Sequence, residues 1–268
     1  MMPNARAVGM GEAYTALADD ATALTWNPAG LSRLSQWSAH AMYHRYIENV
    51  SFHYLAAGHK VQDLGGVAAH FLLMDSGEMY KTTEDSSGNL AQMNTTFWVS
   101  SWSAAVGWGQ ELSGGLRVGA AAKWIQQEID RVSTSGFAVD MGVQHDNFSG
   151  LRIGAVMQNL GLGLGGKALP LTIRMGAAGI PLTSLTVALE GVWVFGPGLS
   201  FRSGVEWRLD PQLALRAGYQ TGIGAGGLSG LHTGVGTAFF DDTMKVDYAL
   251  APLGDFGLSH RVSLGLIF

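Results

Sequence analysis

Apolar and polar side chains alternate along this chain, and that alternation constrains the fold more than any other feature. In residues 258–268 nearly every even position is apolar, whereas the odd positions include Ser259, Arg261 and Ser263. Side chains with a period of two lie on opposite faces of a β-strand. The pattern therefore predicts an all-β chain of about fourteen antiparallel strands. The predicted strands cover residues 36–46, 49–60, 64–75, 97–109, 115–127, 133–145, 150–159, 170–180, 184–195, 198–208, 212–220, 227–239, 242–250 and 257–268.

The number of strands and the composition favour a membrane barrel over a soluble sandwich. A sandwich shows the same alternation, but it has about seven to nine strands in roughly 100 residues. Charged residues make up only 14% of the 268 residues, 38 residues are glycine, 8 are tryptophan, and mean hydropathy is +0.16. No run approaches the roughly 18 apolar residues of a membrane helix. We therefore expect a transmembrane β-barrel in a bacterial outer membrane, with membrane lipid around it.

The connections between the predicted strands differ at the two ends of the barrel. Those at one end are short and polar, whereas those at the other end are longer and include one of about twenty residues. Bacterial barrels have short periplasmic turns and longer extracellular loops. The short turns are 61–64, 109–114, 145–150, 181–184, 209–212 and 241–242, and the longer loops contain 80–96, 160–170, 221–230 and 251–257.

The segment before the strands has a different pattern. Helix-forming residues lie between Glu12 and Leu24, and Trp26-Asn27-Pro28 follows as a stop. The segment could lie across the outside of a sandwich or plug a barrel, and the strands favour the plug. We expect a plug in residues 1–35 and a barrel in residues 36–268. Because no leader pattern follows Met1, we expect that the sequence is that of a mature chain or begins downstream of its true start.

Charged residues on the polar faces of the strands are expected to pair inside the barrel, because a plugged lumen holds little water. We expect Asp247 to lie opposite Arg261, Glu206 opposite Arg216, and Glu190 near Arg202. These pairs could fix strand register and hold the plug, or they could take part in gating or substrate selection. The predicted lumenal ladder is Arg152, Arg174, Glu190, Arg202, Glu206, Arg216, Asp247 and Arg261.

The plug is expected to contact this ladder. Asp19 and Asp20 could pair with Arg152, Arg174 or Arg202.

Three consecutive residues, Asn27, Pro28 and Ala29, form the end of the plug segment. We expect Asn27 and Pro28 to end its helix and to hydrogen-bond to the barrel wall. Replacing Asn27 should then loosen the plug and raise permeability to hydrophobic probes.

Trp98 and Trp108 lie ten positions apart on the apolar face of one predicted strand. At roughly 3.3 Å per residue and a tilt near 40°, they would be about 25 Å apart along the membrane normal. This spacing predicts that they belong to two aromatic girdles. The alternative is that both are core residues of a sandwich.

Several chemical functions lack a sequence signal. With no cysteine there is no disulfide, thiol nucleophile or cysteine-ligated metal, and a net charge of −5 gives no basic stripe for nucleic acid. His40, His44, His53 and His70 are expected on the inner face, but their spacing does not show that they converge on a metal. We expect no enzyme, catalytic residue, cofactor or metal.

Five stretches of the sequence together resemble FadL-like outer-membrane proteins. GMGEAYTALADDATALTWNPAGL (9–31) is similar to their N-terminal plug, with Asn27-Pro28-Ala29 at its centre. Within that superfamily the chain most resembles the PorV/PorQ group. The other matching stretches are GAVMQNLG (154–161), LPLTIRMGAA (169–178), LALRAGYQTG (213–222) and VDYALAPLGDFGLSHRVSLGLIF (246–268).

The resemblance implies a fourteen-stranded outer-membrane barrel with a hatch inside, and one of two functions. PorV-like proteins serve type IX secretion and would have secreted proteins and translocon subunits as partners. FadL-like channels pass long-chain fatty acids or other hydrophobic compounds. The short loops argue against a specific fatty-acid role, and the apolar loops 160–170 and 221–230 slightly favour the secretion role. A channel predicts a continuous apolar cavity between plug and wall, whereas a secretion platform predicts apolar external loops without such a cavity.

Overall fold

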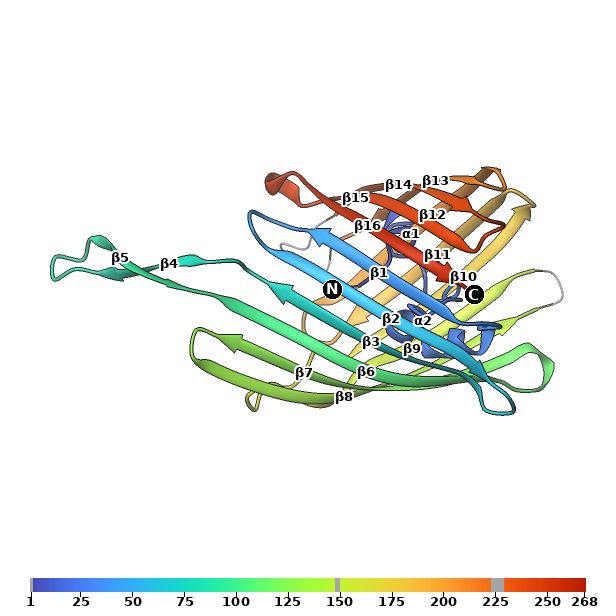
Figure 1. Cartoon of the computed structure of the whole chain (residues 1–268), viewed down its shortest axis with the longest axis horizontal. Coiled ribbons are helices and arrows are strands. Elements are labelled where there is room, and N and C mark those ends of the chain that lie inside the picture. Colours follow the sequence, from blue (N-terminus) through green and yellow to red (C-terminus); the bar gives the residue numbers. More distant parts are fainter. Residues whose placement is uncertain (1, 148–149, 223–228) are drawn as a thin grey trace.

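A computed structural model describes residues 2–147, 150–222 and 229–268. Within these residues, fourteen antiparallel strands close into a single barrel, in which β1 pairs with both β2 and β16 (Figure 1). The predicted fold class is confirmed. The barrel strands are β1 (Ser38–Arg45), β2 (Ser51–Val61), β3 (Gly65–Asp75), β6 (Val99–Glu111), β7 (Leu116–Ile129), β8 (Val132–Asp146), β9 (Arg152–Leu162), β10 (Thr172–Leu182), β11 (Leu185–Val194), β12 (Gly198–Asp210), β13 (Leu213–Gln220), β14 (Gly230–Phe239), β15 (Met244–Pro252) and β16 (Leu258–Ile267).

A second, two-stranded sheet was not predicted from the sequence. It consists of β4 (Met79–Glu84) and β5 (Leu90–Phe97), which pair with each other and project beyond the barrel (Figure 1). Its described side chains are mostly exposed on both faces, so no alternation of apolar and polar residues marks the two strands. We call this end of the barrel the loop end, and the opposite end, with the short connections, the turn end.

The N-terminal segment is folded as short helices joined by turns. They are α1 (Ala5–Gly9), α2 (Ala23–Trp26) and the 3-10 helix η1 (Pro28–Arg33). The helix predicted between Glu12 and Leu24 is therefore mostly wrong. Gly11 and Glu12 have positive φ angles of 63° and 62°, which interrupt a helix. Two further 3-10 turns, η2 (Ser113–Gly115) and η3 (Gly254–Phe256), lie in connections.

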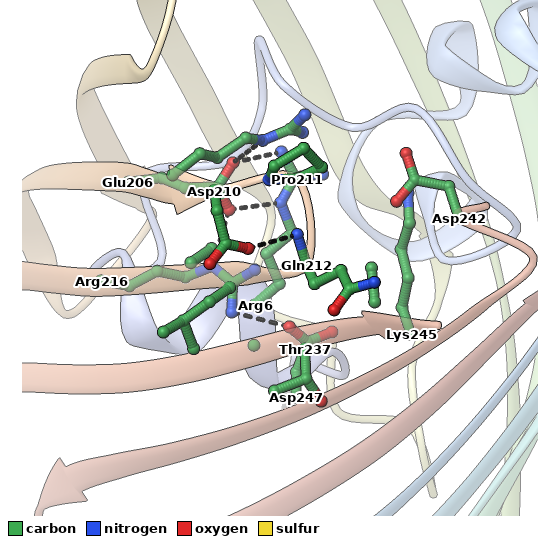
Figure 2. Close-up of a pocket in the computed structure, with 15 residues that line it drawn as sticks. Arg6, Glu206, Asp210, Pro211, Gln212, Arg216, Thr237, Asp242, Lys245 and Asp247 are labelled. Carbon is green, nitrogen blue, oxygen red and sulfur yellow. Dashed lines mark hydrogen bonds and ion pairs between the residues drawn. The ribbon is translucent and has the colours of Figure 1, made fainter. Parts of the chain in front are cut away.

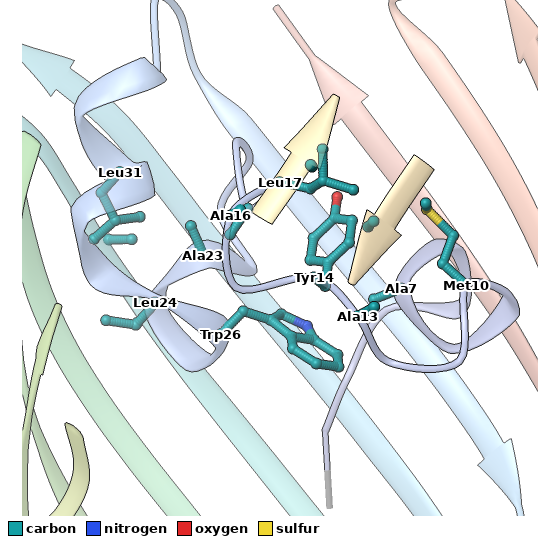
Figure 3. Packing of buried hydrophobic residues seen from close by; sticks show 14 of the residues in the cluster. Ala7, Met10, Ala13, Tyr14, Ala16, Leu17, Ala23, Leu24, Trp26 and Leu31 are labelled. Atoms are coloured by element: carbon teal, nitrogen blue, oxygen red, sulfur yellow. The ribbon is translucent and has the colours of Figure 1, made fainter. Parts of the chain in front are cut away.

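The buried core of the molecule lies between this segment and the inner wall of the barrel. Tyr14 and Trp26 are fully buried and meet edge to face, with ring centroids 5.5 Å apart (Figure 3). Met10, Leu24 and Leu31 are buried in the same cluster. The N-terminal segment and the barrel wall therefore share one core. The division into a plug of residues 1–35 and a barrel of residues 36–268 stays a prediction.

The outer face of the barrel carries large apolar side chains that stay exposed. Leu189 in β11 is 62% exposed and Phe201 in β12 is 60% exposed. Among the helices of the described residues, none is long and apolar enough to cross a membrane.

Candidate functional site

The charged residues of the predicted ladder face the lumen, as expected. Their partners were predicted only partly correctly. The strand register places Glu206 opposite Arg216 and Glu190 opposite Arg202, as predicted. Glu206 and Arg216 form an ion pair, whereas Glu190 pairs with Arg174 and Arg202 pairs with Glu12. The third pairing is wrong, because Asp247 lies opposite Ser263. The connection between β15 and β16 contains η3 and sets a register two residues away from the predicted one.

At the turn end, a buried ion network joins the plug to three strands. Arg6 in α1 binds the Glu206 carboxylate with two hydrogen bonds, from Nε at 2.8 Å and from Nη2 at 2.9 Å. Arg216 reaches Glu206 through Nε at 2.6 Å and Asp247 through Nη1 at 2.6 Å (Figure 2). These alternating charges leave a cavity of only about 50 Å³ at this end. The turn end of the lumen is therefore filled and charged.

A second ion pair holds the main chain of the plug. The Glu190 carboxylate accepts hydrogen bonds from the backbone N–H groups of Tyr14 and Thr15, at 2.9 and 2.8 Å. Arg174 lies 2.6 Å from Glu190, and its guanidinium lies 4.8 Å from the centre of a Trp26 ring. The wall thus satisfies backbone groups that a helix at this position would have used, which explains why turns replace the predicted helix.

Glu12 is a contact of the plug that sequence reasoning missed. Its carboxylate lies 2.8 Å from Arg202 and 3.5 Å from Arg261, and its carbonyl accepts a hydrogen bond from Arg174 at 3.0 Å. Burial alone would raise the pKa of Glu12, but the three arginines lower it to about 2. The predicted ladder contains more arginines than carboxylates. This excess was a sequence signal that the plug supplies an acidic partner.

Asp19 and Asp20 do not meet the arginines that were predicted for them. Asp19 lies 3.4 Å from Arg6, and Asp20 accepts hydrogen bonds from Thr22 within the plug. Their partners are local because Glu12 occupies the position in front of the wall arginines. Arg152 lies 3.9 Å from Asp146 at the turn end.

Asn27 ends α2 and joins the plug to the wall. It is fully buried, and its Nδ2 donates to the carbonyls of Thr15 in the plug and of Val143 in β8, at 3.1 and 3.0 Å. Its Oδ1 accepts from the N–H of Ala29 at 3.2 Å, which caps η1, and Pro28 is the first residue of that helix. The predicted wall contact of Asn27 is present, and the effect of replacing it stays a prediction.

Glycines on the inner wall allow η1 and its cap to lie directly against the strands. A Cβ atom on Gly142 would lie 2.0 Å from Asn27 Oδ1, and one on Gly119 would lie 2.3 Å from the carbonyl carbon of Pro28. Gly109 approaches the Pro28 carbonyl in the same way. The three glycines lie opposite one another on the inward face of β6, β7 and β8. Glycines at inward positions of neighbouring strands were a sequence signal for close contact with the plug that we did not use.

A cavity of about 360 Å³ lies between the plug and the wall, toward the loop end. Its apolar part is formed by Leu24 of the plug and by Phe52, Leu72, Met74 and Ile125 of the strands. A second cavity of about 370 Å³ shares Met2 and Phe52 with the first. The polar residues of the first cavity are Thr25, Tyr54, His70, Ser101, Ser103, Lys123, Asp140, Gln158 and Asn159.

The predicted aromatic pair lies at opposite ends of one strand. Trp98 directly precedes β6 and is half exposed, and its carbonyl accepts from the N–H of Asp130 in the loop-end connection between β7 and β8. The Trp108 Nε1 donates to the carbonyl of Leu64 at the turn end. Their place in aromatic girdles stays a prediction.

One of the four histidines expected on the inner face lies on the outer face. His53 is exposed, because it lies opposite the exposed Tyr43, whereas His40, His44 and His70 are buried. In the part of the chain that the structure describes, no group of three His, Cys, Asp or Glu side chains could hold a metal ion.

Comparison with known proteins gives a family model and a set of structural neighbours. A model of the uncharacterised protein family UPF0164 matches residues 3–220. No curated protein sequence matches the chain.

Three solved structures illustrate the fold. The toluene transporter TbuX of Ralstonia pickettii has a TM-score of 0.75 at 14% identity, covering 99% of this chain and 98% of that one. The toluene transporter TodX of Pseudomonas putida has a TM-score of 0.73 at 11% identity, covering 97% and 95%. A FadL homologue of Pseudomonas aeruginosa has a TM-score of 0.69 at 9% identity, covering 99% and 98%. These likenesses show a FadL-like barrel fold and leave the finer resemblance to the PorV/PorQ group a prediction.

Proposed function

Because this chain belongs to the UPF0164 family and has the fold of FadL-like barrels, we propose that it is a bacterial outer-membrane channel that passes small hydrophobic molecules. Passage is passive and involves no chemical reaction. Two of the structural neighbours are described as toluene transporters, which agrees with a substrate of that class.

The outer face of the barrel supports a membrane location. Large apolar side chains such as Leu189 and Phe201 are more than half exposed there. Soluble monomers rarely expose continuous apolar surface of more than a few hundred Å², whereas a membrane barrel presents an apolar band to lipid.

The cavity of about 360 Å³ is the observation that carries the proposal. A cavity of about 150 Å³ lined by apolar side chains can bind benzene, so this one has room for a molecule with a single aromatic ring. Transfer of such a molecule from water to an apolar wall is favourable because apolar surface leaves water. The path would continue through displacement of the plug, which fills the turn end.

The secretion role is supported by the sequence resemblance and by the apolar loops 160–170 and 221–230. A continuous apolar cavity between plug and wall was the feature expected of a channel, and a cavity lined by both apolar and polar residues lies there. Of the two apolar loops that favoured secretion, loop 221–230 falls largely outside the described residues. The alternative drawn from the sequence, a channel for hydrophobic molecules, is therefore the one that we propose.

The test compares two neighbouring substitutions on β6. Ser103→Trp places an indole in the cavity, whereas Ala104→Trp places one on the opposite, outer face. The measurement is uptake of radiolabelled toluene by a bacterial host that has no hydrocarbon channel of its own. We expect the wild-type protein to raise the initial rate, Ser103→Trp to return it to the host background, and Ala104→Trp to leave it high. Equal uptake by both variants would contradict the proposal.

A further inference from the structure

The cavity has a polar floor that a channel for plain hydrocarbons does not need. His70 on β3, Ala105 on β6 and Lys123 on β7 lie opposite one another in the strand register, in one row across the sheet. All three line the cavity. Because the middle residue is alanine, no long side chain of β6 stands between His70 and Lys123 in this row.

Both polar side chains of this row keep hydrogen-bonding capacity. His70 uses Nδ1, which lies 3.1 Å from the Thr25 hydroxyl of the plug, and its Nε2 has no partner among the described residues. Lys123 Nζ donates to the Asp140 carboxylate at 2.8 Å, and an ammonium group has three protons to donate. A hydrogen-bonding group of a ligand above Ala105 would therefore have one of these side chains on either side of it.

We propose that the cavity selects small molecules with an apolar body and one neutral hydrogen-bonding group, a hydroxyl or a carbonyl, which is bound between His70 and Lys123. This inference rests on the proposed channel function and narrows its substrate class. The apolar body would pack against Leu24, Leu72 and Ile125 on the cavity wall.

The charge of the site favours a neutral group over a carboxylate. Lys123 and Asp140 form a pair with no net charge, and Asp140 is only 3% exposed. Asp140 also accepts a hydrogen bond from the N–H of Asn159 at 2.7 Å, which fixes it in place. A carboxylate ligand would be a second negative charge beside a buried one, and the cost of removing it from water would not be offset.

The experiment is a competition for channel-mediated toluene uptake in the same cells. p-Cresol and p-xylene have nearly the same shape and differ by a hydroxyl in place of a methyl group. For each variant we determine the concentration of p-cresol that halves toluene uptake and the concentration of p-xylene that does the same. The quantity compared is the first concentration divided by the second. The double substitution Lys123→Met with Asp140→Asn removes the charges together and keeps an acceptor for the Asn159 N–H.

We expect this double variant to raise the ratio about fivefold, which is the effect of one hydrogen bond of ordinary strength. His70→Leu should raise it as well, and it provides an independent variant if the double variant does not assemble. The matched control is Lys245→Met with Asp242→Asn, an ion pair at the turn end whose atoms lie 3.8 Å apart, and it should leave the ratio unchanged. In wild-type cells benzoate should compete much more weakly than p-cresol.

The failures of the two proposals are distinguishable. If wild-type cells take up toluene no faster than the host, the channel function itself fails. If they take up toluene but the ratio is the same in the double variant, in His70→Leu and in the control, only the selectivity inference is overturned. Competition by benzoate as strong as that by p-cresol would also overturn it.

Discussion

Glu12 shows how one residue of the plug can decide whether the lumen is closed. Its side chain faces Arg202 and Arg261 from two strands that are distant in sequence, and its carbonyl binds Arg174 from a third. Removing one partner of a buried ion pair leaves an uncompensated buried charge, which costs about 3–5 kcal/mol. The closed position of the plug should therefore depend on this carboxylate.

We predict that Glu12→Gln opens the plug at neutral pH. The glutamine leaves Arg202 and Arg261 without a charged partner, so the free energy that holds the plug should fall by about 3–5 kcal/mol. Single-channel conductance in a planar bilayer measures the opening. Glu84→Gln on the exposed β4–β5 hairpin is the control and should stay closed. Conductance of Glu12→Gln equal to that of the wild type would contradict the prediction.

The same residue predicts the pH dependence of the wild-type protein. The pKa of Glu12 is lowered to about 2 in the folded protein, from an ordinary value of about 4.5. A lowered pKa gives stability that is fully present above the ordinary value and is lost as pH falls through the lowered one. Conductance should therefore stay low down to about pH 4.5 and rise toward pH 2, and Glu12→Gln should lack most of this rise.

At the scale of elements, the plug is held by the wall and not by its own helices. α1 has 5 residues and α2 has 4, and isolated helices of such lengths are unstable in water. One side of the barrel binds the plug through ion pairs of Arg6 and Glu12 with residues of β12 and β16. The other side binds it through close contacts with glycines such as Gly142 and Gly119. An ion pair between Arg33 of η1 and Asp146 of β8, at 2.6 Å, adds to these contacts.

We predict that Gly142→Val displaces η1 and its cap. A Cβ atom at this position would lie 2.0 Å from Asn27 Oδ1, so the plug must move, and such overpacking costs about 1–3 kcal/mol or more. Gly191→Val on β11 is the matched control, since a Cβ there meets no atom within 4 Å and valine suits a strand. Limited proteolysis of the N-terminal segment in intact cells should cut the first variant faster than the second. Equal rates of cleavage would show that the glycine contact does not hold the plug.

At the scale of the whole molecule, the protein has its apolar surface on the outside and its charges inside. The buried ions lie around the plug, whereas the outer face of the strands carries leucine, phenylalanine and tryptophan. This arrangement is stable only where the outer face meets an apolar medium. In aqueous solution the whole apolar outer surface would be in contact with water, which is unfavourable. The β4–β5 hairpin does not belong to that face and extends beyond the barrel (Figure 1).

We predict that an arginine is costly on the outer face of the barrel and not on the hairpin. Leu189→Arg, in the middle of β11, should lower the free energy of unfolding in lipid vesicles by about 2–4 kcal/mol. Leu90→Arg on β5 should change it little, although Leu90 is even more exposed, at 80% compared with 62%. Urea unfolding monitored by tryptophan fluorescence measures both. A small effect of Leu189→Arg would place β11 outside the membrane.

The amino-acid sequence by itself determined the strands of the barrel and the facing of most of their side chains, with His53 as an exception. Alternation is a local property, so the fourteen barrel strands, the inward position of Arg174 or Glu206 and the outward position of Leu189 follow from it directly. The sequence also placed Asn27 at the end of a plug helix, because a residue followed by proline seldom continues a helix.

Only the tertiary structure decided which side chains meet. Asp247 binds Arg216 and not Arg261, since a shift of two residues in one hairpin keeps the facing of every side chain and changes its partners. Glu12 takes the place expected of Asp19 and Asp20, because the path of the plug is set by the wall it contacts. The cavity and its row of His70 and Lys123 depend on both the register of three strands and the position of the plug, and no local pattern contains that information.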